Sequence, residues 1–213
     1  KYNTNVYEGA LINDLRFNSN TNFTDLGLLN KFKFLFKNVN TKAKKSHKYR
    51  NSTDTQLLSA VQFETSYPLS KTTPEGNNLL TPTASIMFSP NKSRNIVNED
   101  RPVNTNNIFS FDRIASSETV EGGLSLTVGS NFKKINKQED QVIELDLAQV
   151  FRVDENNDLP SNSTIGNTSS DIIGKLKLEP NKYFNLEYDF SLDNSLSESN
   201  YNLIKSEISV NKL

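Results

Sequence analysis

The chain has 213 residues, of which 34% are hydrophobic, and its 24 basic residues nearly balance 25 acidic ones. This balance, without a basic stripe, excludes a nucleic-acid-binding protein. The absence of cysteine excludes disulfides, zinc–thiolate sites and a thiol nucleophile within these residues. A mean hydropathy of -0.60 would suit a disordered chain. However, the apolar residues are concentrated at alternate positions, and no run approaches the roughly 18 apolar residues of a membrane-spanning helix.

Strict apolar/polar alternation predicts about nine β-strands, because successive side chains of a strand point to opposite faces. Residues 185–192 are the clearest example, since every even position is apolar and every odd position is polar. Most of the predicted strands have about 8–12 residues, close to the length with which a tilted strand crosses a bilayer. In chain order they lie near residues 9–17, 32–36, 58–69, 80–89, 124–132, 143–151, 172–178, 186–192 and 201–210.

The connections between these strands alternate in length. Long connections are expected at residues 38–56, 90–119 and 152–171, and shorter ones after the first, third, fifth and seventh strands. Long loops on one side and tight turns on the other are typical of outer-membrane barrels. We therefore expect an all-β fold, an antiparallel meander with open edges that forms part of a large transmembrane outer-membrane β-barrel. Its lipid-facing residues should include Phe32, Phe34, Phe36, Leu186, Tyr188 and Phe190.

Few residues suggest chemistry. His47 stands in the cationic run 42–50; it is a candidate general base, but no serine or aspartate motif surrounds it, which favours a solvated loop residue. The run itself either contacts anionic lipid headgroups or is simply solvated. Asp112, Glu118 and Glu121 are a conceivable acid pair or metal site, yet their spacing matches no known metal loop. We assign no catalytic, cofactor-binding or metal-binding residue.

Residues 107–129 form the most specific segment, NIFSFDRIASSETVEGGLSLTVG. It resembles a segment of the LPS-assembly protein family LptD (OstA), in the form found in alphaproteobacteria, where a long loop leads into a barrel strand. Shorter matches follow the same order along most of the chain. They lie at residues 79–82, 88–90, 98–101, 149–152, 159–160, 170–174 and 185–188.

This resemblance implies that residues 1–213 are an interior piece of a single C-terminal barrel domain. The family's periplasmic N-terminal domain, its terminal barrel strands and its inter-domain cysteines are not in this piece. The implied function is insertion of lipopolysaccharide into the outer leaflet of the Gram-negative outer membrane, without covalent chemistry. Implied partners are lipopolysaccharide, outer-membrane lipid, an LptE-like plug lipoprotein and the periplasmic lipopolysaccharide-transport bridge. Two alternatives stay open: a generic porin-like channel, and a soluble all-β binding or adhesion domain.

The long loop before the fifth strand carries the candidate anchoring residues Phe109, Phe111, Asp112, Arg113 and Glu121. We expect an arginine–carboxylate pair, Arg113 with Glu121 for example, to fold this loop into the lumen. The two phenylalanines would then pack inside the barrel mouth. The alternative is an ordinary solvated loop.

Overall fold

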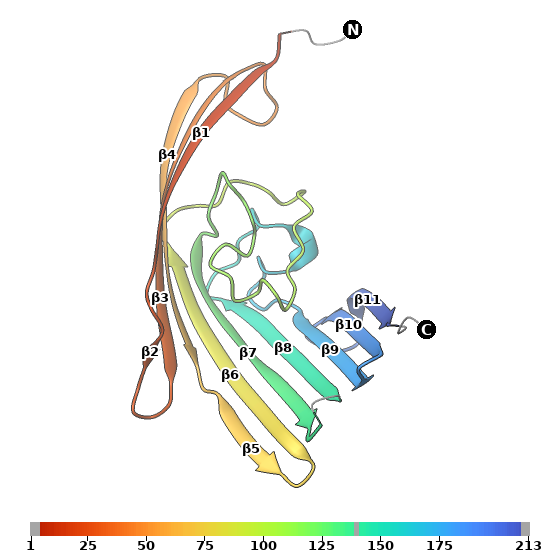
Figure 1. Ribbon diagram of the computed structural model, residues 1–213. Helices are drawn as coiled ribbons and strands as arrows, with labels where there is room; N and C mark the ends of the chain where they lie inside the picture. Colours follow the sequence, from red (N-terminus) through yellow and green to blue (C-terminus); the bar gives the residue numbers. More distant parts are fainter. Residues whose placement is uncertain (1–4, 139–140, 210–213) are drawn as a thin grey trace.

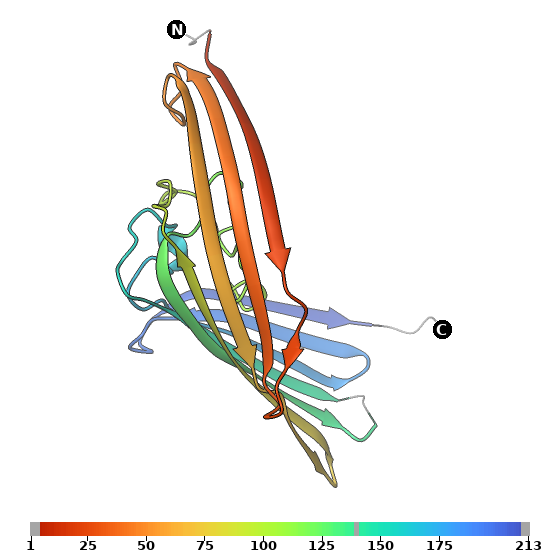
Figure 2. The ribbon, with the colours of Figure 1, turned by 90° about the vertical axis from the view of Figure 1, so that its left-hand side faces the viewer.

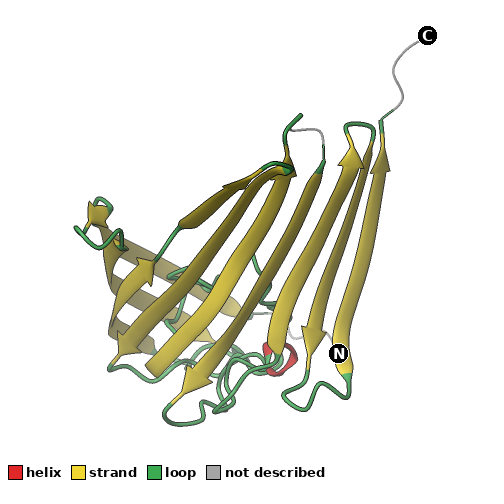
Figure 3. Ribbon diagram, turned by 90° about the horizontal axis from the view of Figure 1, so that it is seen from below, coloured by secondary structure: helices red, strands yellow, loops and turns green. Residues whose placement is uncertain are grey.

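The computed structural model describes residues 5–138 and 141–209. These residues form one curved sheet, with a short 3-10 helix, η1 (Ser161–Ser163), among the loops (Figures 1 and 3). Two short strands, β2 (Asn22–Phe23) and β5 (Leu69–Thr73), pair beside longer ones. The long strands are β1 (Tyr7–Asn18), β3 (Leu29–Lys44), β4 (Thr53–Ser66), β6 (Gly76–Ser89), β7 (Gly123–Asn136), β8 (Val142–Arg152), β9 (Ile172–Asn181), β10 (Phe184–Leu192) and β11 (Ser199–Ile208).

The long strands follow one another across the sheet in the order β1-β3-β4-β6-β7-β8-β9-β10-β11, and every pairing is antiparallel. This confirms the predicted meander of sequence neighbours. Strands β1 and β11 are the open edges of the sheet. The tight turns lie at one end of the strands and the long loops at the other (Figure 1). An open sheet of this kind is consistent with a section of a barrel wall.

The predicted long loop at residues 38–56 is wrong. Strand β3 continues to Lys44 and β4 starts at Thr53. Most of this segment is therefore a β-hairpin, which we call the tall hairpin, and its first paired residues after the turn are Lys42 and Thr53. The outward side chains of β3 in this segment are Asn and Lys, so the outward phenylalanines end at Phe36 while the backbone pairing continues. Ladder hydrogen bonds need no apolar side chains, which explains why the pattern missed the strand.

The predicted third strand, 58–69, is two strands. Strand β4 ends at Ser66, and β5 begins at Leu69 on the far side of Pro68. Proline has no N–H to donate to a ladder, so the chain leaves β4 here and starts a separate hairpin with β6. The ninth predicted strand corresponds to β11, which ends at Ile208; the predicted end at Val210 lies outside the described residues.

The convex face of the sheet is apolar and uncovered. In one row across five strands, Phe32, Phe63, Ile86, Leu126 and Phe151 stand in register. Each has between 37% and 51% of its surface exposed, and no second sheet covers them within the described residues. This face therefore does not fit a soluble sandwich, in which it would be buried. Of the residues predicted here, Phe32 and Phe36 are exposed, and Phe34, Leu186, Tyr188 and Phe190 are half-buried on the same parity.

The concave face carries the two long loops, residues 90–122 and 153–171, which together we call the loop cap. The loops lie against the inner side of the sheet and do not extend into solvent (Figure 1). They are joined to each other by backbone hydrogen bonds: Ile96 N–H donates to the Asp158 carbonyl at 2.8 Å, and Ser161 N–H to the Val97 carbonyl at 3.1 Å. An apolar core forms between cap and sheet from Ile96, Ile108, Ile114, Leu159 and Ile165 of the cap and Ala148, Val150 and Ile173 of the strands.

Candidate functional site: the loop cap on the inner wall

Arg113 is the most completely bonded side chain of the cap, with 3% of its side chain exposed. Its Nε donates to Glu121 Oε2 at 2.7 Å, and its terminal nitrogens reach Glu121 Oε1 at 2.5 Å and Ser125 Oγ at 3.0 Å. The remaining donors meet Thr127 Oγ1 at 2.7 Å and the Ile108 carbonyl at 3.2 Å. A guanidinium has five N–H donors, and all of them are used here. Arg113 therefore fixes the loop to the first residues of β7.

Glu121 is shared between two arginines. Its Oε1 also accepts from Arg152 at 2.5 Å, and the Arg152 side chain at the end of β8 is 1% exposed. Arg152 donates in addition to the carbonyl of Gly122. Burial alone would raise the pKa of Glu121, but the two guanidiniums outweigh it and hold that pKa below its ordinary value. The carboxylate is thus ionised at neutral pH and ties the loop to both β7 and β8.

The sequence around Glu121 explains this geometry. Ser125 and Thr127 lie two residues apart on β7, so both hydroxyls point to the inner face. Gly123 adopts φ +89°, a conformation that side chains rarely allow, at the point where the loop becomes the strand. Gly129 lies under the Phe109 ring: a Cβ there would be 3.0 Å from Phe109 Cζ and 2.7 Å from Ala148 Cβ. The motif residues therefore serve the docking of the loop.

The two predicted aromatic residues contact the inner wall at different places. Phe109 packs against the apolar core of the cap, and its carbonyl accepts a hydrogen bond from Gln62 Nε2 at 3.2 Å. Phe111 packs against a second cluster on the inner faces of β3 and β4, formed by Leu35, Val39 and Leu58 together with Val120 of the loop. The loop thus spans the inner face from β8 to β3. Whether this placement narrows a passage stays a prediction.

Asp112 does not join the Arg113 network. Its Oδ2 lies 3.3 Å from Arg16 of β1, an arginine with 46% of its side chain exposed. Beside this pair, Lys37 of β3 is almost completely buried; its Nζ contacts Asp14 Oδ1 at 2.9 Å and donates to the Ser117 carbonyl at 2.9 Å. Lys37 and Arg152 are anchoring residues that the sequence analysis missed. The available signal was a charged residue on the inner parity of a strand beside a long loop.

Glu118 forms a further cluster near the tall hairpin. It accepts from Lys48 at 2.7 Å and from the Tyr49 hydroxyl at 2.6 Å, and Arg94 lies 3.2 Å away. Burial acts to raise the pKa of Glu118, but these partners prevail and lower it. His47, in the turn above, is exposed. No group of three or more potential metal ligands occurs in the described part of the chain.

Outside the cap, the inner wall is lined by charges of both signs. Asn131 donates to Asp146 at 2.6 Å, and Asp189 lies 3.6 Å from Lys175 and 3.5 Å from Lys205. These residues alternate with the apolar outer residues of the same strands, β7 to β11. Such a wall is suited to water and polar solutes on one side and to lipid on the other.

An apolar outer face, a polar inner face and an inner cap made of the protein's own loops define a wall section of an outer-membrane-type β-barrel. Residues 5–138 and 141–209 contain no helix of the length and apolarity that a membrane span requires.

The family model described as LptD, LPS transport system D, matches residues 28–210, and the chain belongs to this family. The family is one of outer-membrane lipopolysaccharide-transport proteins and not of enzymes. No curated protein matched the chain.

Proposed function

We propose that the full-length protein is an outer-membrane translocon that inserts lipopolysaccharide into the outer leaflet, and that this chain is an interior section of its barrel wall. The observation that carries the proposal is the two-faced sheet with an anchored inner cap, in a chain of the LptD family. Lipopolysaccharide joins a charged saccharide to acyl chains. A wall that is polar inside and apolar outside offers each part a matching environment.

The role proposed for the cap is closure of the outer mouth. It is held by the Arg113–Glu121–Arg152 network and by an apolar core, and both act without a bound partner. A closed mouth keeps the hydrated lumen from leaking while lipid leaves sideways through the wall. An LptE-like plug lipoprotein would fill the lumen beside the inner wall of β8 to β11. The periplasmic transport bridge would deliver lipopolysaccharide to the barrel from the periplasmic side.

A porin-like channel is the second candidate, because the mixed-charge inner wall would also pass small ions. The two candidates differ in what fails when the protein is removed. Cells depleted of the full-length protein are expected to lose newly made lipopolysaccharide from their surface, measured by pulse labelling and treatment of whole cells with an impermeant lipid A-modifying enzyme. If surface delivery is normal and only the uptake of small solutes declines, the protein is a channel and the translocon proposal is wrong.

A further inference from the structure

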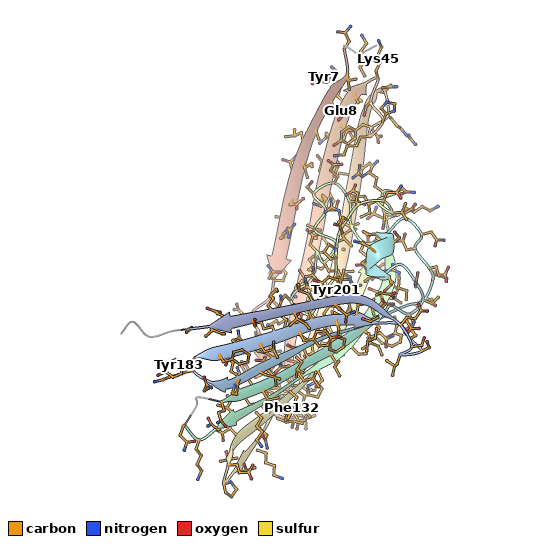
Figure 4. All side chains as sticks on the ribbon, turned by 90° about the vertical axis from the view of Figure 1, so that its right-hand side faces the viewer. Tyr7, Glu8, Lys45, Phe132, Tyr183 and Tyr201 are labelled. Carbon is orange, nitrogen blue, oxygen red and sulfur yellow. The ribbon has the colours of Figure 1, made fainter. Side chains whose placement is uncertain are left out.

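The upper ends of β1, β3 and β4 form a blade that rises beyond the loop cap (Figures 1 and 2). We define the blade as residues 7–13, 38–44 and 53–57. Strand β3 has 16 residues, whereas a tilted strand crosses a bilayer with about 9–11. At least five residues of β3 therefore lie outside the hydrocarbon layer. Figure 4 labels Tyr7, Glu8 and Lys45 at this far end.

The outward side chains of β3 change character abruptly along one parity. They are phenylalanine up to Phe36 and then only asparagine and lysine. On the neighbouring strands the outward apolar residues continue further, with Leu57 (58% exposed) beside Asn38 and Leu11 (64% exposed) beside Asn40. A lipid-facing strand surface becomes polar where the hydrocarbon ends, so the row of Asn40 and Leu11 marks the outer boundary. In order from the tight-turn end, the outward residues of β3 are Phe32, Phe34, Phe36, Asn38, Asn40, Lys42 and Lys44.

Beyond this boundary, an aromatic ring and two cations share the outer face. Tyr7 is the cross-strand partner of Lys44, and Gly9 is the partner of Lys42. The Tyr7 ring lies over Gly9, because a Cβ there would be 3.0 Å from the tyrosine hydroxyl oxygen. Tyr7 is 55% exposed. A ring of this kind presents an apolar surface and a polar hydroxyl to solvent, and lysines beside it attract anionic groups.

The acidic residues of the blade face the other way. Glu8 and Asp54 occupy the opposite parity; Ser46 donates to Glu8 at 2.5 Å and Gln56 donates to Asp54 at 3.0 Å. Among the described residues, Lys42 and Lys44 have no ion-pair or hydrogen-bond partner on their side chains. The outer face is thus cationic and has no internal neutralisation.

We infer that the outer face of the blade binds the anionic saccharide region of lipopolysaccharide in the outer leaflet; the inference rests on the proposed function. Measured from the Asn40 row, Lys42 is two residues further, or about 5 Å above the boundary after tilt, and Lys44 is four residues further, or about 9 Å above it. The headgroup layer of a phospholipid bilayer is only about 5–8 Å thick on each side. Lys42 therefore stands at the height of lipid phosphates, and Tyr7 and Lys44 stand above that layer, at a height that the sugars of a glycolipid reach.

A photo-crosslinking pair tests the placement in cells that express the full-length protein. A photoreactive residue at Thr53, the cross-strand partner of Lys42, should give lipopolysaccharide adducts. The same residue at Gln56, exposed on the opposite parity of β4, is the matched control and should give few. Adducts of phospholipid at Thr53, equal lipopolysaccharide adducts at both positions, or no adduct at Thr53 would each overturn the inference.

Charge removal tests the chemistry. The double substitution Lys42→Gln and Lys44→Gln should lower the Thr53 adduct yield, with about a fivefold loss of affinity for each lysine. Removal of Lys71 and Lys137, exposed near the tight turns, is the matched control and should change nothing. An unchanged yield in the first variant refutes the cationic recognition. Delivery of lipopolysaccharide to the cell surface is measured in parallel. If delivery depends on the protein but no adducts form at Thr53, this inference is wrong and the proposed function stands. If delivery does not depend on the protein, the proposed function is wrong whatever the adduct yield.

Discussion

Replacing Arg113 with alanine should release the loop cap from the wall. The substitution removes every hydrogen bond of a buried guanidinium, including the two-pronged contact with Glu121. Removing one partner of a buried ion pair costs about 3–5 kcal/mol. The loss is partly limited here because Glu121 keeps Arg152. A cost in this range raises the population of the undocked cap by a factor between about one hundred and a few thousand. The strands keep their own ladders, so barrel abundance should not change.

The assay combines hydrogen exchange with permeability. Backbone amides of residues 94–119 in the full-length Arg113→Ala protein should exchange faster, and cells carrying it should become sensitive to large antibiotics. Arg16→Ala is the control, because that half-exposed arginine contacts Asp112 in a surface pair worth at most about 1 kcal/mol. Faster exchange with unchanged permeability would show that the cap does not close the passage. Unchanged exchange would show that the ion network does not hold the cap.

Three further outcomes are expected. Tyr188→Arg, on the outer face of β10, should lower the free energy of unfolding in lipid by about 2–4 kcal/mol if the residue lies near the bilayer midplane. Asn185→Arg, on the inner face of the same strand, is the control and should lower it less. Equal losses in urea titrations would contradict the assignment of faces. Gly129→Ala should destabilise the cap by about 1–3 kcal/mol through overpacking, because its Cβ would lie 2.6 Å from the Leu147 carbonyl oxygen; an unchanged urea midpoint would exclude that contact. The pKa of Glu121 is below its ordinary value of 4.5. The stability that its ionised carboxylate contributes is therefore fully present above pH 4.5 and is lost as the pH falls through the lowered pKa. Exchange protection of the cap should therefore stay constant from pH 7 to about 4.5 and decline below it; a decline starting near pH 6 would contradict the ion network.

The sequence predicted the strands wherever apolar residues alternate with polar ones, because that pattern reports which face meets lipid. It failed where the large apolar side chains of the outer face end. In the upper half of β3, from Asn38 to Lys44, the outward residues are asparagine and lysine, and the apolar residues Val39 and Ala43 are buried on the inner face, so the pattern there predicts a loop. The break at Pro68 was missed for the opposite reason: Tyr67 and Leu69 continue the alternation although the backbone ladder stops between them.

The candidate site was predictable only within one stretch of sequence. Arg113 and Glu121 are eight residues apart in a motif-rich segment, and the structure brings them together. Arg152 and Lys37 come from strands far away along the chain; the alternation marks their side chains as inward, but nothing local shows that they are buried or which loop residues they contact. Such partners depend on strand register and on where a loop folds back, and both are properties of the whole sheet.

The composition of the Glu121 network has a consequence for the order of assembly. Its members come from the loop before β7 and from the end of β8, and the apolar core of the cap adds Ile173 from β9. Contacts between segments this distant form late in folding, because the intervening chain must first be positioned. The cap can reach its final position only after β7, β8 and β9 are paired. On the closure role proposed for the cap, a nascent barrel has an open mouth until this part of the wall is complete.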